Sequence, residues 1–77
     1  MRWECRYSSC EMFYVEVTAT DVRAYLHHSP QNADRWTFEE VMDGALDRSE
    51  VGVLFNDDEI AEMKAEAQTR VNARLSP

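Results

Sequence analysis

Glycine and proline are scarce in this chain of 77 residues, with two of each, and no low-complexity tract interrupts it. A composition so poor in loop-forming residues excludes collagen-like and linker-like chains and argues against disorder outside the ends. No internal repeat is present, so a single small domain is expected over residues 1–77. A domain of this size buries only about 60% of the surface of its unfolded chain, which favours surface binding over a deep active site.

Long hydrophobic runs are also lacking. The longest is Val51–Phe55, which includes Gly52, whereas a membrane span needs about 20 apolar residues. The N-terminal stretch MRWECRY has no apolar core of the kind found in a secretory signal. These absences predict a cytoplasmic protein without a membrane partner.

The two cysteines, Cys5 and Cys10, are fewer than a small secreted domain usually carries. Two reduced thiols are expected, and a disulfide within a hairpin is one alternative. Half of a zinc site, completed by His27 and His28, is another, but adjacent histidines on a helix point about 100° apart and do not readily share a metal. No cofactor is therefore predicted.

Positive charge is scarce, since one lysine and seven arginines face 15 acidic residues, for a net charge of −7. Direct binding of nucleic acid is disfavoured, because it leaves a footprint of clustered lysine and arginine. The acids are concentrated in residues 39–62, where nine of them accompany a single base, Arg48. Such a block favours a basic protein surface as partner.

Two amphipathic strands are expected at the N-terminus, because apolar and polar residues alternate in MRWECRY and EMFYVEVT. A two-residue loop between them would mix the two faces. A three-residue loop, Ser8–Cys10, instead pairs Cys5 with Phe13 and leaves one apolar and one polar face. Cys5 then points inward, and Tyr14 lies on the outer face of the sheet.

The segment TATDVRAYLHHSP is predicted to form the first helix. Thr18 and Asp21 have the spacing of a capping box, and the apolar residues that follow recur at helical spacing. Pro30 would end this helix one or two residues before it. The stretch SPQNADRW is then a loop that places Trp36 just before the next helix.

Two further helices and a third strand are predicted beyond that loop. Thr37 and Glu40 form a capping box for an amphipathic helix over about 38–47, and Asn56 and Glu59 cap a long last helix. Between them, the β-branched stretch VGVLF favours a short third strand. The expected order is ββααβα: an α+β domain with an N-terminal antiparallel β-hairpin, a short third strand, and three helices on one sheet face.

The densest acidic stretch, FNDDEIAEM, has a simple structural explanation. Asp57 and Asp58 fall in the first turn of a helix, where each contributes about 0.3–1 kcal/mol. A calcium loop alternates its ligands around a glycine, and DGALDRSE lacks that order, so no metal site is predicted. No serine, cysteine or histidine has the spacing of an activated nucleophile, so neither an enzyme nor catalytic residues are expected.

A second set of acids is not explained by helix stability. On the predicted helix, Glu39, Asp43 and Asp47 recur every four residues without a base, and like charges at that spacing cost about 0.2–0.5 kcal/mol per pair. The strip is either a solvated face or a fixed negative surface for a cationic partner. Tyr14 and Trp36 are candidate aromatic anchors. The candidate partner-binding residues are Glu39, Glu40, Asp43, Asp47, Glu50, Asp57, Asp58, Trp36 and Tyr14.

In size, charge and lack of catalytic motifs, the chain resembles small phage-encoded inhibitors of the anti-CRISPR and anti-restriction type, and the stretch FEEVMDGALDRSEVGVLFNDDEIAE carries this similarity. The resemblance implies a non-enzymatic inhibitor in the host cytoplasm that occludes a basic nucleic-acid-binding surface by mimicking nucleic acid. The alternatives are a structural or regulatory module with an apolar homodimer interface, and an antitoxin-like regulator. A monomer or weak homodimer is expected.

Overall fold

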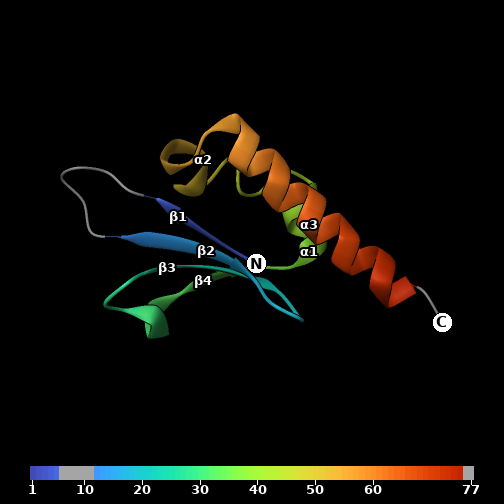
Figure 1. The fold of residues 1–77 in the computed structure, drawn as a ribbon, viewed down its shortest axis with the longest axis horizontal. Helices are drawn as coiled ribbons and strands as arrows, with labels where there is room; N and C mark the ends of the chain where they lie inside the picture. The colour runs from blue at the N-terminus through green and yellow to red at the C-terminus, as the bar shows by residue number, and fades with distance from the viewer. Residues whose placement is uncertain (6–11, 76–77) are drawn as a thin grey trace.

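Four antiparallel strands form a meander, and three helices that follow them in sequence pack on one face of the resulting sheet (Figure 1). The computed structural model describes residues 1–5 and 12–75. The elements are β1 (Arg2–Cys5), β2 (Phe13–Val17), β3 (Val22–Leu26), the 3-10 turn η1 (Pro30–Asn32), β4 (Asp34–Trp36), α1 (Phe38–Met42), α2 (Val51–Leu54) and α3 (Asp57–Leu75). The α+β class is confirmed, but the predicted order ββααβα is wrong.

The first hairpin has the predicted register. Cys5 lies opposite Phe13 and Trp3 opposite Val15, so the apolar side chains of β1 and β2 share one face. Cys5 points inward and is buried, as expected, and Tyr14 lies on the other face. The loop itself, with Cys10, lies outside the described residues.

The first predicted helix is wrong, because Thr18 and Asp21 close a turn between two strands. The Thr18 hydroxyl oxygen lies 2.7 Å from Asp21 Oδ1 and accepts the Asp21 N–H at 3.0 Å. A hydroxyl three residues before an acid can bind the backbone of a turn as well as that of a helix N-terminus. The chain therefore returns as β3, with Val22 opposite Val17 and with Ala24 buried on the same face.

The segment predicted as a loop contains η1 and the short edge strand β4. In β4, Trp36 lies opposite Val22, which places its side chain on the helix-covered face, half-buried against the core. Trp36 is thus part of the packing between sheet and helices, and its expected position in a loop is wrong. His27 and His28, expected at a helix end, lie in a turn after β3.

The capping box of Thr37 and Glu40 is confirmed, with the Glu40 N–H 3.1 Å from Thr37 Oγ1 and the Thr37 N–H 2.9 Å from Glu40 Oε1. The helix it opens ends at Met42, however, and not at residue 47. Gly44 has a φ of +94°, in the left-handed region that a right-handed helix cannot contain. The chain continues through turns that bury Leu46 completely.

The predicted third strand is the short helix α2. A Cβ atom on Gly52 would lie 2.4 Å from the carbonyl oxygen of Asp47, so the backbone of α2 packs directly against the preceding turn. The predicted cap of α3 is confirmed, since the Glu59 N–H donates to Asn56 Oδ1 at 2.8 Å and Glu59 Oε1 accepts the Asn56 N–H at 3.2 Å. Apolar residues of α3 then face the sheet, as expected.

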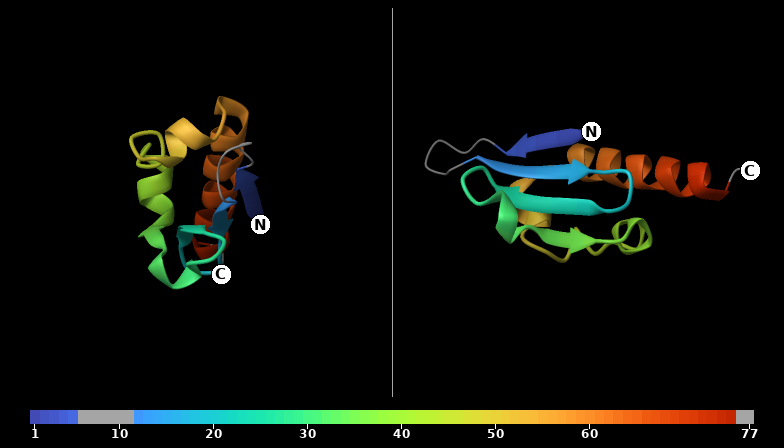
Figure 2. Two further views of the ribbon diagram at one scale, coloured as in Figure 1. Left: turned by 90° about the vertical axis from the view of Figure 1, so that its left-hand side faces the viewer. Right: turned by 90° about the horizontal axis from the view of Figure 1, so that it is seen from below.

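The core lies between the sheet and the helices, and none of the described α-helices covers the opposite face of the sheet (Figure 2). The helix α3 runs past one end of the sheet, so its last turn exposes Leu75. No described helix combines the length and the apolar character that a membrane crossing requires. The largest fully buried side chains among the described residues are Phe38, Leu46, Met63, Val15, Val22, Val41 and Val51.

Candidate interaction surfaces

The helical layer carries the acids of residues 39–62. Almost all of these acids are exposed, and we call the exposed ones the acidic helical surface. It consists of Glu39, Glu40, Asp43, Asp47, Glu50, Asp57, Asp58 and Glu62. These carboxylates are held by short helices and turns in place of the single long helix that the sequence predicted.

Two of the predicted strip residues have basic partners. Asp47 Oδ2 lies 2.7 Å from Lys64 Nζ, and Glu39 forms an ion pair with Arg74. Both bases lie on α3, which packs alongside α1, so the uncompensated strip predicted on one helix is wrong at these two positions. The pairs join residues 17 and 35 positions apart, which a local reading of helix periodicity cannot detect.

The carboxylate of Glu39 is stabilised in its charged form. A hydrogen bond from its own backbone N–H, followed by the Arg74 guanidinium, lowers its pKa below the ordinary value of 4.5. Both groups favour the anion over the acid. Glu39 is therefore charged and paired at neutral pH.

Six carboxylates of the acidic helical surface form no salt bridge with a described residue: Glu40, Asp43, Glu50, Asp57, Asp58 and Glu62. Asp57 and Asp58 lie in the first turn of α3, where negative charge is favourable. Asp43 instead caps the C-terminus of α1, where negative charge is unfavourable. Glu50 stands at the N-cap of α2 without a capping hydrogen bond from its side chain. Asp43 thus has no evident stabilising role, and Glu50 gains at most the weak N-terminal interaction of a helix of four residues.

The sheet face that carries no helix forms a second surface, which we call the open sheet face. The strand register places its outward side chains in two rows across the strands. The first row is Arg2, Glu16, Arg23 and Arg35, and the second is Glu4, Tyr14 and Tyr25. Most of this surface was not predicted, because the local sequence pattern favours a helix at β3 and a loop at β4.

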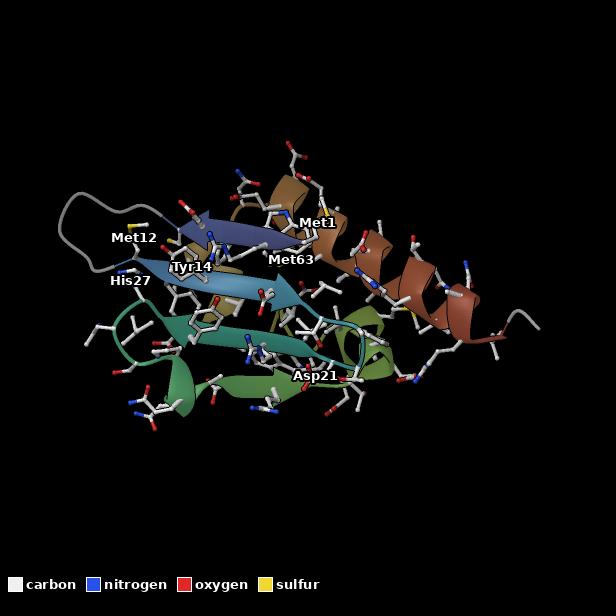
Figure 3. All side chains as sticks on the ribbon, turned by 60° about the horizontal axis from the view of Figure 1, so that its bottom comes forward. Met1, Met12, Tyr14, Asp21, His27 and Met63 are labelled. Atoms are coloured by element: carbon white, nitrogen blue, oxygen red, sulfur yellow. The ribbon has the colours of Figure 1, made fainter. Side chains whose placement is uncertain are left out.

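Aromatic and guanidinium groups stack along the open sheet face. The rings of Tyr14 and Tyr25 lie 5.5 Å apart, and the guanidinium carbon of Arg2 lies 4.6 Å from the centre of the Tyr14 ring. Arg23 lies 5.4 Å from the Tyr25 ring. Figure 3 shows Tyr14 on this face beside His27, whose Nδ1 is 3.4 Å from the Tyr14 hydroxyl. Only 5% of Tyr14 remains exposed, so its neighbours largely cover this candidate anchor.

Each arginine of the open sheet face has a nearby carboxylate. The nitrogen–oxygen distance is 2.5 Å between Arg23 and Glu16, and 3.7 Å between Arg35 and Asp21. The third pair joins Arg2 to its neighbour Glu4, at 3.6 Å. Asp21 lies in the β2–β3 turn, at the end of the open sheet face. When Asp21 is counted with this face, its three described arginines are balanced by three described carboxylates.

The inward thiol of Cys5 donates a hydrogen bond to the Leu54 carbonyl oxygen at 3.2 Å. It lies beside a hollow of about 420 Å³ between β1 and the start of α3. Within residues 1–5 and 12–75, no group of three histidine, cysteine, aspartate or glutamate side chains is placed to hold a metal ion. Cys10, the other half of the zinc alternative, falls outside those residues.

Comparison with known proteins adds no assignment: no family model, no curated protein sequence and no solved structure matches this chain.

Proposed function

We propose that the chain is a non-enzymatic protein-interaction module that binds a cationic, nucleic-acid-handling protein through its acidic helical surface. Bound there, it blocks the nucleic-acid site of that protein. The observation that supports this proposal best is the placement of Asp43 and Glu50, which are exposed and form no salt bridge with a described residue. Asp43 also lies at the C-terminus of α1, where negative charge is unfavourable, and the side chain of Glu50 makes no capping hydrogen bond to α2.

The charge of this half of the chain supports a long-range attraction. Residues 38–77 contain ten acids and four bases, a net charge of −6 out of −7 for the whole chain. A fixed field of one sign steers a partner of opposite sign and raises the association rate, with strong dependence on ionic strength. Nucleic-acid sites are rich in lysine and arginine, so they are the partner surface that fits.

The internal ion pairs define the centre of the proposed contact. Glu39 and Asp47 already face bases of α3, so a partner gains less from them. The strongest attraction is expected from Asp43 and Glu50, extended by the acids at the start of α3. Trp36 is partly buried against the core between the layers, so less of its side chain is available to this contact than the sequence suggested.

A competition assay tests the proposal. Labelled DNA is bound to each of a panel of RNA-guided nuclease complexes and restriction enzymes, and the purified chain is added at about 50 mM and about 500 mM NaCl. Displacement from at least one target is expected at the lower salt and is expected to weaken strongly at the higher salt, because surface charges are then screened.

The substitution Asp43→Lys locates the contact, and Asp34→Lys is its matched control. Asp34 is an exposed aspartate of β4 without a salt bridge to a described residue, and both substitutions change the net charge from −7 to −5. Asp43→Lys should weaken displacement about tenfold, and Asp34→Lys much less, since only the former reverses a contact charge. Equal effects of the two variants would show that net charge alone acts and would refute the proposed surface.

A further inference from the structure

The open sheet face differs from the acidic helical surface in carrying no net charge. Its three arginines lie 2.5–3.7 Å from carboxylates of the same face, so they offer no excess positive charge. Binding of nucleic acid depends on neutralising phosphates with uncompensated lysine and arginine. This face is therefore unsuited to nucleic acid, although arginine and tyrosine side chains dominate it.

The side chains of the open sheet face are held in place before any partner binds. Arg2 lies over Tyr14, Tyr14 stacks on Tyr25, and Arg23 covers the Tyr25 ring. Tyrosine and arginine are the residues most enriched in the energetic centres of protein interfaces. Side chains that are already ordered lose less conformational entropy on binding. These features indicate a protein partner.

The distribution of charge favours a second copy of the chain as the protein that binds the open sheet face. Two copies that met through their helical sides would bring together two halves of charge −6. If they met through their open sheet faces, two neutral surfaces would be in contact. With about 10 Å between packed layers, the two helical layers would then lie about 30 Å apart. That exceeds three Debye lengths of about 8 Å, so their repulsion is largely screened.

We propose that two copies pair through their open sheet faces, with Tyr25 and the row of arginines in contact across a twofold axis. Such a contact is self-complementary, because the arginines of one copy can approach the carboxylates of the other. The pairing is independent of the proposed function. Where both hold, the dimer presents two acidic helical surfaces pointing in opposite directions, and a target with two cationic sites would bind it with avidity.

The area of the open sheet face limits how tightly two copies are expected to bind. Four strands about 4.8 Å apart and about five residues long cover roughly 300 Å². This is less than the roughly 800 Å² per partner of a standard stable interface, so a weak and reversible dimer is expected. The two copies should therefore exchange between monomer and dimer at accessible concentrations.

Analytical ultracentrifugation of the full chain between about 10 µM and 1 mM tests the pairing. Arg35→Glu is the test variant, because Arg35 is 64% exposed and its ion pair with Asp21 is long. Arg48→Glu is the matched control: it lies in the exposed turns of the helical layer, and both variants change the net charge from −7 to −9. Arg35→Glu should weaken the dimer at least about tenfold and Arg48→Glu less than about threefold. The wild-type dimer should persist at 500 mM NaCl, since neutral faces meet.

Concentration-dependent amide chemical shifts locate the contact without any substitution. The shifts should move in β2 and β3 and stay constant in α3. A monomer at 1 mM, equal effects of the two variants, or shifts confined to the helices would each overturn the pairing. A monomer that still displaces DNA from its target would leave the proposed function intact, so the two failures are distinguishable.

Discussion

The sheet layer and the helical layer treat charge in opposite ways. On the open sheet face, each arginine lies near a carboxylate of the same strand, a neighbouring strand or the β2–β3 turn, and the three pairs cancel. In the helical half, acids outnumber bases ten to four, and six exposed carboxylates form no salt bridge with a described residue. The sheet is therefore a locally neutral surface, whereas the helices carry nearly all the net charge. Charged side chains thus give the two layers surfaces of different net charge.

The largest expected effect comes from the core that joins the two layers. Phe38 is 1% exposed and lies between α3 and the sheet, with Arg74 over its ring. Phe38→Ala should lower the free energy of unfolding by about 3–5 kcal/mol, through lost burial and the cavity left behind. Urea denaturation measures this. Leu75→Ala is the control, since Leu75 is 78% exposed and should change stability by less than about 0.5 kcal/mol. Similar losses in both would contradict the placement of the core.

The next effect tests why the helical layer folds into short helices. Gly52→Ala should destabilise the chain by about 1–3 kcal/mol, because the new methyl group would lie 2.4 Å from the Asp47 carbonyl oxygen. Gly44→Ala has room for its methyl group, with the nearest side-chain atom at 3.5 Å, but it would hold alanine at a φ of +94°. Gly44→Asn should be milder than Gly44→Ala, since asparagine tolerates this region better. Denaturant unfolding of the three variants separates steric from conformational causes, and a neutral Gly52→Ala would contradict the close approach.

A smaller effect compares two similar motifs, one in each layer. Thr37→Ala removes the cap of α1 and should cost about 1 kcal/mol, with faster amide exchange in α1. Thr18→Ala removes the hydroxyl that closes the β2–β3 turn, and faster exchange should appear in those strands instead. Hydrogen exchange followed by NMR reports both. Exchange that increased in the same element for both variants would show that the motifs do not act locally.

These two threonines also show how far the sequence predicts the fold. In the hairpin, strict alternation fixed the register, and two of the three proposed helix caps are real. Thr18 and Asp21 have the spacing of the third, but the segment after them alternates as a strand as well as it repeats as a helix. The sheet decides between the two, because Val22 and Ala24 complete an apolar face begun by β2. A local sequence pattern cannot detect this pairing of β3 with β2.

The candidate site was predictable to a similar extent. The acids of residues 39–62 are exposed on one layer, as the charge pattern indicated. Their pairing was not predictable, because Lys64 and Arg74 reach Asp47 and Glu39 only once α3 packs beside α1. The open sheet face was missed for the same reason, since its arginine row exists only when four strands align. Long-range packing determines both results.

The smallest expected effect concerns the pH dependence of one ion pair in the helical layer. The pKa of Glu39 is lowered in the folded chain by its own backbone N–H and then by Arg74. A lowered pKa stabilises the folded state fully above the ordinary value of 4.5, and this stabilisation is lost as the pH falls through the lowered pKa. The difference in melting temperature between the wild type and Glu39→Gln should therefore be constant between about pH 7 and 6 and shrink below about pH 4.5. Arg74→Gln provides the control, because only the backbone hydrogen bond then lowers the pKa of Glu39. In the Arg74→Gln background, Glu39→Gln should therefore change the melting temperature less than it does in the wild type. If the difference in melting temperature grew with acidification, the folded chain would disfavour the charged form of Glu39. The neighbouring acids of the helical layer would then outweigh its backbone N–H and Arg74.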